Sequence, residues 1–161
     1  MSFLKVFDYT APESYAGVLQ GVIGQSAGWL THLDLDSNSL GSEGVSRLAG
    51  VLAQCTSLRY LGLGANSVDD DGAENVARVL HQCPALRTLD LEQNLIECHG
   101  AGSLARVLVV CTALTKLDLQ HNVIGCHGAG SLARVLVVCT ALTKLDLAFN
   151  EIGPGGAESL A

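Results

Sequence analysis

The sequence is poor in several residue types that would point to particular protein classes. Aromatic residues make up only 4% of the 161 residues, and there are three prolines. A core must therefore be built mainly from Leu, Val, Ala and Ile. The hydrophobic share of 48% is ample for such a core and argues against disorder. No apolar run approaches the length of a membrane span, so we expect no transmembrane helix.

Basic residues are also few. Nine Lys and Arg stand against 16 Asp and Glu, which gives a formal net charge of −7. Nucleic acid requires a basic surface for its phosphates, so this charge disfavours nucleic-acid binding. The opening stretch, MSFLKVFDYTAPES, lacks the basic start and the apolar stretch of a secretory signal. We therefore expect a soluble cytoplasmic protein whose partners, where charge matters, carry a basic patch.

What the sequence does have is an internal repeat. From Leu30 onward it aligns with itself at a period of 28 residues, and the stretch CHGAGSLARVLVVCTALTKLDL occurs twice without a change. A constant period is typical of a solenoid, whose stacked coils bury apolar faces that no single coil can bury. We predict an N-terminal unit and five repeats, of which the last is incomplete: 1–29, 30–57, 58–85, 86–113, 114–141 and 142–161.

Each repeat reads as a strand, a turn, a helix and a return. Its first residues follow LxxLxLxxN, where the last two leucines alternate with polar residues as in a strand with one buried face. The asparagine that ends this motif is expected to form a hydrogen-bonded ladder through the stack. A glycine column is expected to permit a tight entry into the helical segment. Its members are Gly44, Gly72, Gly100, Gly128 and Gly156.

This pattern resembles the ribonuclease-inhibitor-like class of leucine-rich repeats, which includes the sensor regions of NOD-like receptors. The motifs that carry the resemblance, LxxLxLxxNxLxxxG and LxxVLxxC, recur from Leu30 to Ala161. The resemblance implies an α/β solenoid shaped as a right-handed horseshoe, with a parallel β-sheet on the concave side and α-helices on the convex side. It also favours a protein-interaction module, and we expect no enzyme because no catalytic constellation is evident. A GTPase-activating protein, another member of this class, is less favoured because we cannot place the Arg and Asn it would need.

The two ends of the chain differ in kind. Residues 1–29 look like a degraded repeat, with Leu4, Phe7 and Tyr9 imitating the strand, and we predict an N-terminal capping unit. Its bulky rings, together with Phe3 and Trp29, would cover the first coil. The last repeat stops at GPGGAESLA without a recognisable cap, although solenoids need capped ends to remain soluble. We expect either a fragment of a longer array or a homodimer in which a second copy covers this end.

The six cysteines fall into two sets. One column lies at the helix ends, where we expect small buried thiols that stay unpaired in a reducing compartment: Cys55, Cys83, Cys111 and Cys139. The other set is the pairs Cys98–His99 and Cys126–His127, which carry the residue types of a zinc site. Neighbouring side chains diverge, however, and the other repeats have unrelated residues there. We favour a surface loop and predict no metal and no other cofactor.

The partner-binding surface is expected on the concave face, at the outward positions of the strands and the turns that follow. Its candidate residues are His32, Asp34, Asp36, Tyr60, Thr88, Asp90, Glu92, Lys116, Asp118, Gln120, His121, Lys144, Asp146 and Phe149. An aspartate column in this set, interrupted by Gly62, forms an acidic stripe able to receive Lys or Arg from a partner. Lys116 and Lys144 would neutralise it in part. The alternative is that LDL is simply common in such repeats. The turn column of Ser37, Ala65, Gln93, His121 and Phe149 varies most, as a specificity position would.

A second candidate surface lies on the convex side. Val109, Val110, Val137 and Val138 stand where earlier repeats carry Ala, Gln or His. We expect Val110 and Val138 on the outer side of their helices, near Arg106 and Arg134, either as a contact patch or packed against each other. No catalytic constellation is evident. The predicted function is partner or ligand recognition, and the alternative is a structural repeat that self-associates through its C-terminal coil.

Overall fold

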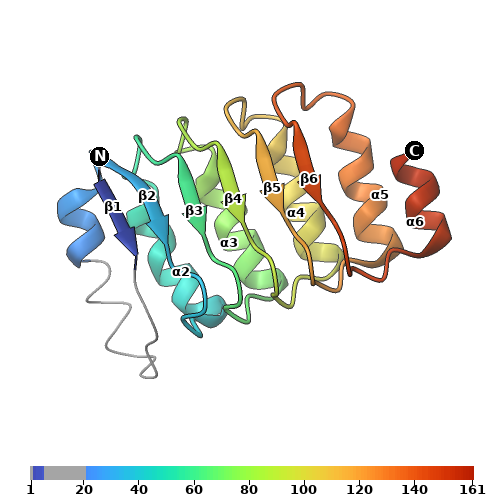
Figure 1. Ribbon diagram of the computed structural model, residues 1–161, viewed down its shortest axis with the longest axis horizontal. Helices are drawn as coiled ribbons and strands as arrows, with labels where there is room; N and C mark the ends of the chain where they lie inside the picture. Colours follow the sequence, from blue (N-terminus) through green and yellow to red (C-terminus); the bar gives the residue numbers. More distant parts are fainter. Residues whose placement is uncertain (1, 6–20) are drawn as a thin grey trace.

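The computed structural model describes residues 2–5 and 21–161 (Figure 1). Its strands are β1 (Ser2–Lys5), β2 (Leu30–Asp34), β3 (Tyr60–Gly62), β4 (Thr88–Asp90), β5 (Lys116–Asp118) and β6 (Lys144–Asp146). Its long helices are α2 (Gly41–Leu52), α3 (Asp70–Leu80), α4 (Cys98–Leu108), α5 (Gly125–Leu136) and α6 (Gly153–Leu160). Residues 21–26 are also helical. The predicted alternation of strand and helix is confirmed from Leu30 onward.

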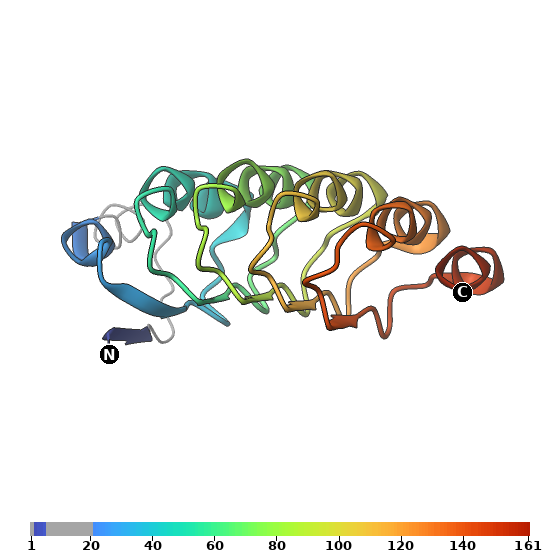
Figure 2. The same cartoon turned by 90° about the horizontal axis from the view of Figure 1, so that it is seen from above.

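The strands form one parallel sheet in chain order, β1 to β6. Each residue pairs with its equivalent one repeat later, as in the row Leu33, Leu61, Leu89. Figure 2 shows all the helices on one side of the sheet, along the outside of a shallow arc. The predicted solenoid, with its sheet inside and its helices outside, is therefore confirmed.

The core lies between the sheet and the helices. Leucines that point inward from the strands, such as Leu61 and Leu89, are at most 1% exposed. They pack on the inner faces of the helices, where Leu48 and Leu104 are fully buried. The strand leucine of β6, Leu145, is only partly buried because β6 is the edge strand of the sheet.

The predicted asparagine ladder is confirmed. Asn66 Oδ1 accepts the backbone N–H of Asn38 at 3.0 Å, and Asn94 Oδ1 accepts that of Asn66 at 3.1 Å. From Asn66 onward, each amide nitrogen donates to carbonyls of its own coil and of the coil before, as Asn94 does to Leu91 and Leu63 at 3.0 Å. The five asparagines are at most 5% exposed. Each coil is therefore joined to the next by buried side chains as well as by the sheet.

The reason given above for the glycine column needs correction. These glycines lie inside the first turns of the helices, and their backbone angles are not ones that require glycine. A Cβ on Gly100 would lie 2.5 Å from Asp70 Oδ1 and 3.0 Å from Ala73 Cβ, both in the preceding helix. Glycine is needed there for the close approach of successive helices and not for a sharp entry. Positive φ occurs instead at Gly41, Gly125 and Gly153, each the first residue of its helix.

The cysteines divide as predicted, with one correction. Cys55 and Cys83 are buried, and Cys111 and Cys139 are half-buried against the core. Burial raises the pKa of Cys55 to about 11 and that of Cys83 to about 12, so these thiols stay protonated. All six cysteines are free. The Cys–His pairs, however, lie in the first turns of α4 and α5 and not in a loop.

At the N-terminus, β1 pairs in parallel with β2, and Leu4 is partly buried. Phe3 and Trp29 remain 61% and 60% exposed, so neither ring is buried on the first coil. Phe7 and Tyr9 lie outside the described residues. The capping unit at 1–29 and the repeat boundaries stay predictions. Within the described part of the chain, no helix is both long enough and apolar enough to cross a membrane.

Candidate functional site: the concave surface

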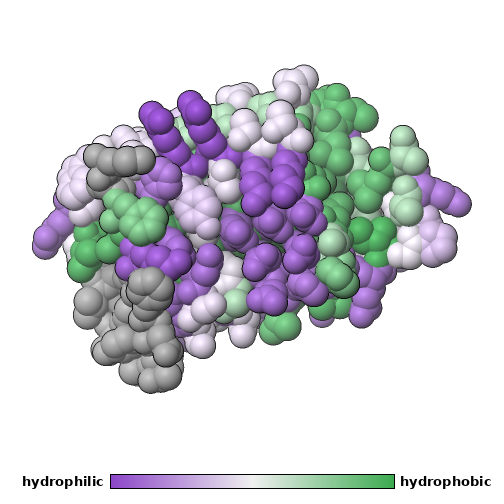
Figure 3. Space-filling model, in the orientation of Figure 1, coloured by the Kyte–Doolittle hydropathy of each residue, from purple (hydrophilic) through white to green (hydrophobic). Residues whose placement is uncertain are grey.

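The strand register aligns the residues of the predicted outward columns side by side. The first column runs through Phe3, His32, Tyr60, Thr88, Lys116 and Lys144. The second runs through Lys5, Asp34, Gly62, Asp90, Asp118 and Asp146. Seen from this side, hydrophilic side chains gather over the middle of the sheet (Figure 3). The concave face is therefore a polar surface whose composition changes from coil to coil.

Most of the aspartate column is paired with lysine. Lys116 Nζ lies 3.3 Å from Asp118 Oδ2, and the equivalent pair in the next coil, Lys144 and Asp146, is 3.8 Å apart. Asp34 pairs with Lys5, a partner that the sequence analysis missed. Asp34 and Asp118 are only 7% exposed. The predicted neutralisation by lysine is confirmed, and the stripe is less open to a partner than its regular pattern suggested.

The unpaired acids gather around Tyr60. Gly62 and Gly64 leave the second coil without side chains at the two concave positions that follow Tyr60, and neighbouring side chains lean into the space. A Cβ on Gly62 would lie 2.7 Å from Asp36 Oδ1 and 3.0 Å from the Tyr60 hydroxyl. A Cβ on Gly64 would lie 3.2 Å from Glu92 Cγ. At the interruption of the acidic stripe, Asp36 from the preceding coil and Glu92 from the following coil therefore come together beside Tyr60.

The electrostatics of this place follow from crowding of like charge. Burial, with Asp34 and Asp90 nearby, raises the pKa of Asp36 to about 6, although its Oδ1 accepts the Gly64 N–H at 2.7 Å. Burial also raises the pKa of Asp90. The pKa of Tyr60 is raised by burial and then by the surrounding carboxylates, Asp36 first. Lys5 acts against the rise at Asp36 and Lys116 acts against the rise at Asp90, but neither lysine offsets it.

Further along the face, oxygens of Asp90, Glu92 and Asp118 lie within 4.8 Å of one another. In the described ranges, 2–5 and 21–161, this is the one cluster of at least three potential metal-binding side chains. The Cys–His pairs of the described ranges do not form such a cluster. Cys98 Sγ and Cys126 Sγ lie 3.6 and 3.4 Å from Nδ1 of the imidazoles beside them. Acidic clusters of this kind are common without a metal. Here the carboxylates extend the negative surface around Tyr60.

Aromatic rings line the same surface. The His32 ring lies 6.2 Å from that of Tyr60 at an interplanar angle of 19°, and 6.2 Å from that of Phe3. Aromatic faces attract cations, and the attraction is stronger where water is partly excluded. Strands β1, β2 and β3 therefore place a row of rings beside the unpaired carboxylates, which is chemistry suited to Lys or Arg side chains.

The variable turn column has an unexpected backbone conformation. Ser37, Ala65, Gln93, His121 and Phe149 all adopt positive φ, between 52° and 60°. The sequence showed that this column varies but not that it is left-handed, because its residues are neither Gly nor Asn. In the last two coils the rings of His121 and Phe149 stack with centroids 4.2 Å apart. Phe149 is 71% exposed, so this pair extends the surface at its C-terminal end.

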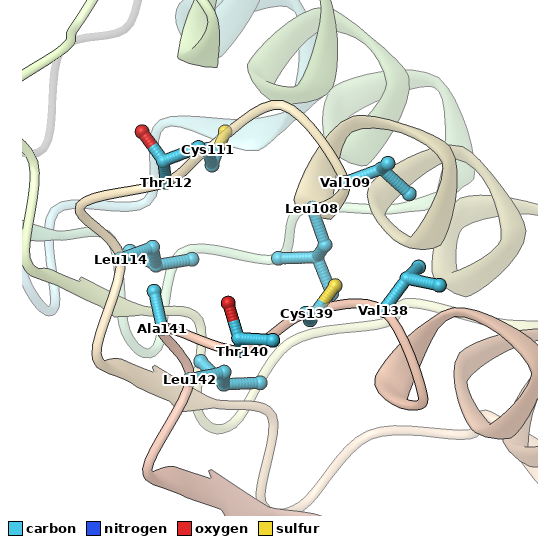
Figure 4. A pocket seen from close by; sticks show the side chains of 10 residues that line it. All are labelled: Leu108, Val109, Cys111, Thr112, Leu114, Val138, Cys139, Thr140, Ala141 and Leu142. Carbon is cyan, nitrogen blue, oxygen red and sulfur yellow. The ribbon is translucent and has the colours of Figure 1, made fainter.

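The convex valines are exposed, as predicted. Val110 and Val138 are 59% and 56% exposed. Val109 and Val138 line one small pocket between the ends of α4 and α5 (Figure 4). Packing of Val110 against Val138, and a contact patch formed by these valines, both stay predictions.

The fold is shared with known proteins. A structure titled as the C-terminal domain of tropomodulin from Caenorhabditis elegans has a TM-score of 0.75 and 13% identity, covering 90% of this chain and 88% of that one. A structure titled leiomodin-1 actin-binding site 2 has a TM-score of 0.77 and 22% identity, covering 92% and 86%. These identities show the fold alone. No curated protein matches the sequence.

The sequence itself matches a family model. The model, described as a leucine-rich repeat, matches residues 29–49, 54–77, 110–133 and 138–161. These segments make up more than half of the chain and correspond to the strand, turn and helix units seen in the structure. The ribonuclease-inhibitor-like class stays a prediction. The chain belongs to the leucine-rich repeat family.

Proposed function

We propose that the chain is a protein-interaction module that recognises a basic segment of a partner on its concave face, centred on Tyr60. The observation that carries this proposal is the collection of unpaired carboxylates around that ring. Asp36, Asp90 and Glu92 form no ion pair among the described residues, whereas Asp34, Asp118 and Asp146 each have a lysine. A cation supplied by a partner would complete the pattern.

A Lys or Arg side chain suits this position for two reasons. Its charge would meet carboxylates already held in place, so little ordering is required on binding. Its stem would lie against the rings of His32 and Tyr60, which supply apolar area and a negative π-face. Above pH 6 Asp36 is ionised, and the attraction is then complete.

The direct test is binding of a synthetic Lys/Arg-rich peptide to the whole chain, measured by calorimetry. Tyr60→Leu and Asp36→Asn should each weaken binding about tenfold, since each removes part of a desolvated charge contact. Asp146→Asn is the matched control, because that acid is already paired with Lys144, and it should leave affinity nearly unchanged. Equal losses in all three variants would mean general electrostatic attraction and would contradict a site at Tyr60.

Actin is a natural partner to include in the test. The leiomodin-1 structure with this fold is titled as an actin-binding site. Cosedimentation with actin filaments, using the same three variants, would show whether this chain binds actin and whether the Tyr60 surface takes part.

A second candidate function is self-association through the edge of β6. In the preceding coil, the N–H groups of Leu119 and His121 donate to Asp146 and Ala148 at 2.9 Å. The equivalent groups of Leu147 and Phe149 have no such partner among the described residues, and exposed strand edges pair readily. Sedimentation at several concentrations tests this idea. A dimer that disappears when an extra capping coil is fused after residue 161 supports it, and a monomer at all concentrations rejects it.

A further inference from the structure

The outer faces of α4 and α5 differ from those of the earlier helices in their ion pairs. In α2, Arg47 pairs with Glu43, and in α3, Arg78 pairs with Glu74 at 2.6 Å, both at i,i+4 spacing. The arginine is repeated as Arg106 and Arg134 one and two repeats after Arg78, but the position of Glu74 is held there by glycine.

The consequence is two arginines without a carboxylate. Arg106 donates to Ser103 Oγ at 2.8 Å, and no ion pair forms at Arg106 or Arg134 within the described part of the chain. The acid one repeat further on, Glu158, is also not paired with Arg134. An acidic protein thus exposes uncompensated positive charge on its convex side.

The same two helices end in exposed valines. Gln82 of the second repeat is replaced by Val110 and Val138, and His81 by Val109 and Val137. Their exposed fractions are 46% for Val109, 59% for Val110, 82% for Val137 and 56% for Val138. Exposed apolar groups that cluster in this way are typical of contact surfaces.

The surface is also hollowed. A groove of about 360 Å³ lies between α3 and α4, with Ala77, Val107 and Val110 on its apolar side. Arg106 lines it without a carboxylate partner, whereas Arg78, which also lines it, is paired with Glu74. Next to it, Val109 and Val138 line the small pocket between the ends of α4 and α5. Grooves between packed helices can accept a further helix whose ridges fit between them.

We propose that this convex surface binds an acidic amphipathic helix of a partner protein. The apolar side of that helix would cover the valines, and its carboxylates would pair with Arg106 and Arg134. An anionic membrane would supply similar charges, but the net charge of −7 opposes approach to such a surface. The site lies on the opposite face of the solenoid from Tyr60 and takes a partner of opposite charge, so it is independent of the function proposed above.

The second repeat suggests matched variants, because it carries Glu74 and Gln82 at the positions that changed. Gly102→Glu with Gly130→Glu restores the i,i+4 acids. The new Cβ atoms meet nothing closer than Ser131 Oγ at 3.9 Å and Ser159 Oγ at 3.8 Å, so both substitutions fit. Val110→Gln with Val138→Gln restores the glutamines. Glu is a better helix former than Gly, so the first double variant should gain thermal stability.

The probe is a synthetic helical peptide with Leu at i, i+3, i+4 and i+7 and Glu on the flanking positions, with a matched peptide in which each Glu is Gln. We expect the whole chain to bind the Glu peptide and each double variant to lose about tenfold or more in affinity. Asp36→Asn should bind this peptide as the unchanged protein does, which separates this proposal from the previous one. Equal affinity for both peptides, unchanged affinity in the double variants, no detectable binding, or binding only to phosphatidylserine vesicles would each overturn the proposal.

Discussion

The first two full coils and the two duplicated coils have the same interior and different exteriors. Both pairs bury leucines in the sheet, asparagine in the ladder and alanine at the helix contacts. On the outside, the earlier coils carry Glu–Arg pairs along the helices and the Tyr60 site on the sheet. The duplicated stretches, Cys98–Leu119 and Cys126–Leu147, carry unpaired arginines, valines and Lys–Asp pairs.

This difference shows how a repeat protein separates stability from recognition. Interior positions contact the next coil in every repeat, so a change there disturbs two interfaces. Outward positions contact solvent or one neighbour, so they are free to differ. The substitutions below test this separation, beginning with the one that should cost most.

Asn66→Ala and Asn122→Ala should destabilise the protein by similar large amounts. Asn66 accepts from Asn38 and Leu40 and donates to Leu35 and Gly64. Asn122 accepts from Ile96 and donates to Leu91, Leu119 and Gln120. Each loss leaves several buried backbone groups unpaired, at a cost of about 3 kcal/mol or more. Urea unfolding of both variants measures it. A much smaller effect at Asn122 would show that the duplicated coils are not held by the same interior.

Two glycines in one helix should respond in opposite directions. Gly100→Ala places a Cβ within 3.0 Å of Asp70, Ala73 and Ile96, so we expect a loss of about 1–3 kcal/mol. Gly102→Ala faces outward and gains helix propensity, so we expect a gain of about 0.5–1 kcal/mol. Thermal unfolding gives both values, and destabilisation by Gly102→Ala would contradict the assignment of this position to the exterior.

The smallest effects should come from the acids of the concave face. The pKa of Asp36 is raised from 3.8 to about 6, so the folded state holds its proton more tightly than the unfolded chain does. Stability from this group is therefore present at low pH and is lost as the pH rises from about 4 to 6. After allowance for solvent screening, Asp36→Asn should stabilise the protein at pH 7 by about 1 kcal/mol and remove this pH dependence.

The matched control is Asp118→Asn. It removes the ion pair with Lys116 and should be neutral or destabilising by at most about 1 kcal/mol. Urea unfolding at pH 4, 5, 6 and 7 gives the free energy of unfolding of both variants and so separates the contributions of Asp36 and Asp118. Stabilisation by both substitutions would mean that net negative charge, and not the crowding around Tyr60, sets the pKa of Asp36.

The repeat pattern was sufficient to predict the strands, the helices, the ladder and the outward columns. Periodicity at 28 residues fixes which positions are equivalent, and the alternation of leucine with polar residues fixes which face is buried. The exposure of Val110 and Val138 followed from the same reasoning. These features depend on spacing along the chain, which the sequence displays directly.

Features that depend on distance between coils were not predictable in the same way. The glycine column was assigned to a turn, although close packing of helices is the reason for it. Asp36 and Glu92 crowd toward Tyr60 because Gly62 and Gly64 leave space. The sequence shows that the aspartate column is interrupted at Gly62, but it does not show which side chains fill the space. The sequence contains the reason why Arg106 is unpaired, since Gly102 replaces an acid four residues before it. This reason becomes clear only when α3, with its Glu–Arg pair, is compared with α4.

The left-handed turn column has a consequence for the entropy of recognition. Each of its five residues is held at positive φ beside an asparagine whose side chain is buried and hydrogen-bonded on both sides. A loop usually loses backbone freedom when it binds a partner, and this loss weakens affinity. Here that freedom is already lost on folding. The five side chains of this column are therefore presented by a backbone that loses no further conformational freedom on binding. Substituting them changes what is recognised without changing the backbone that presents them.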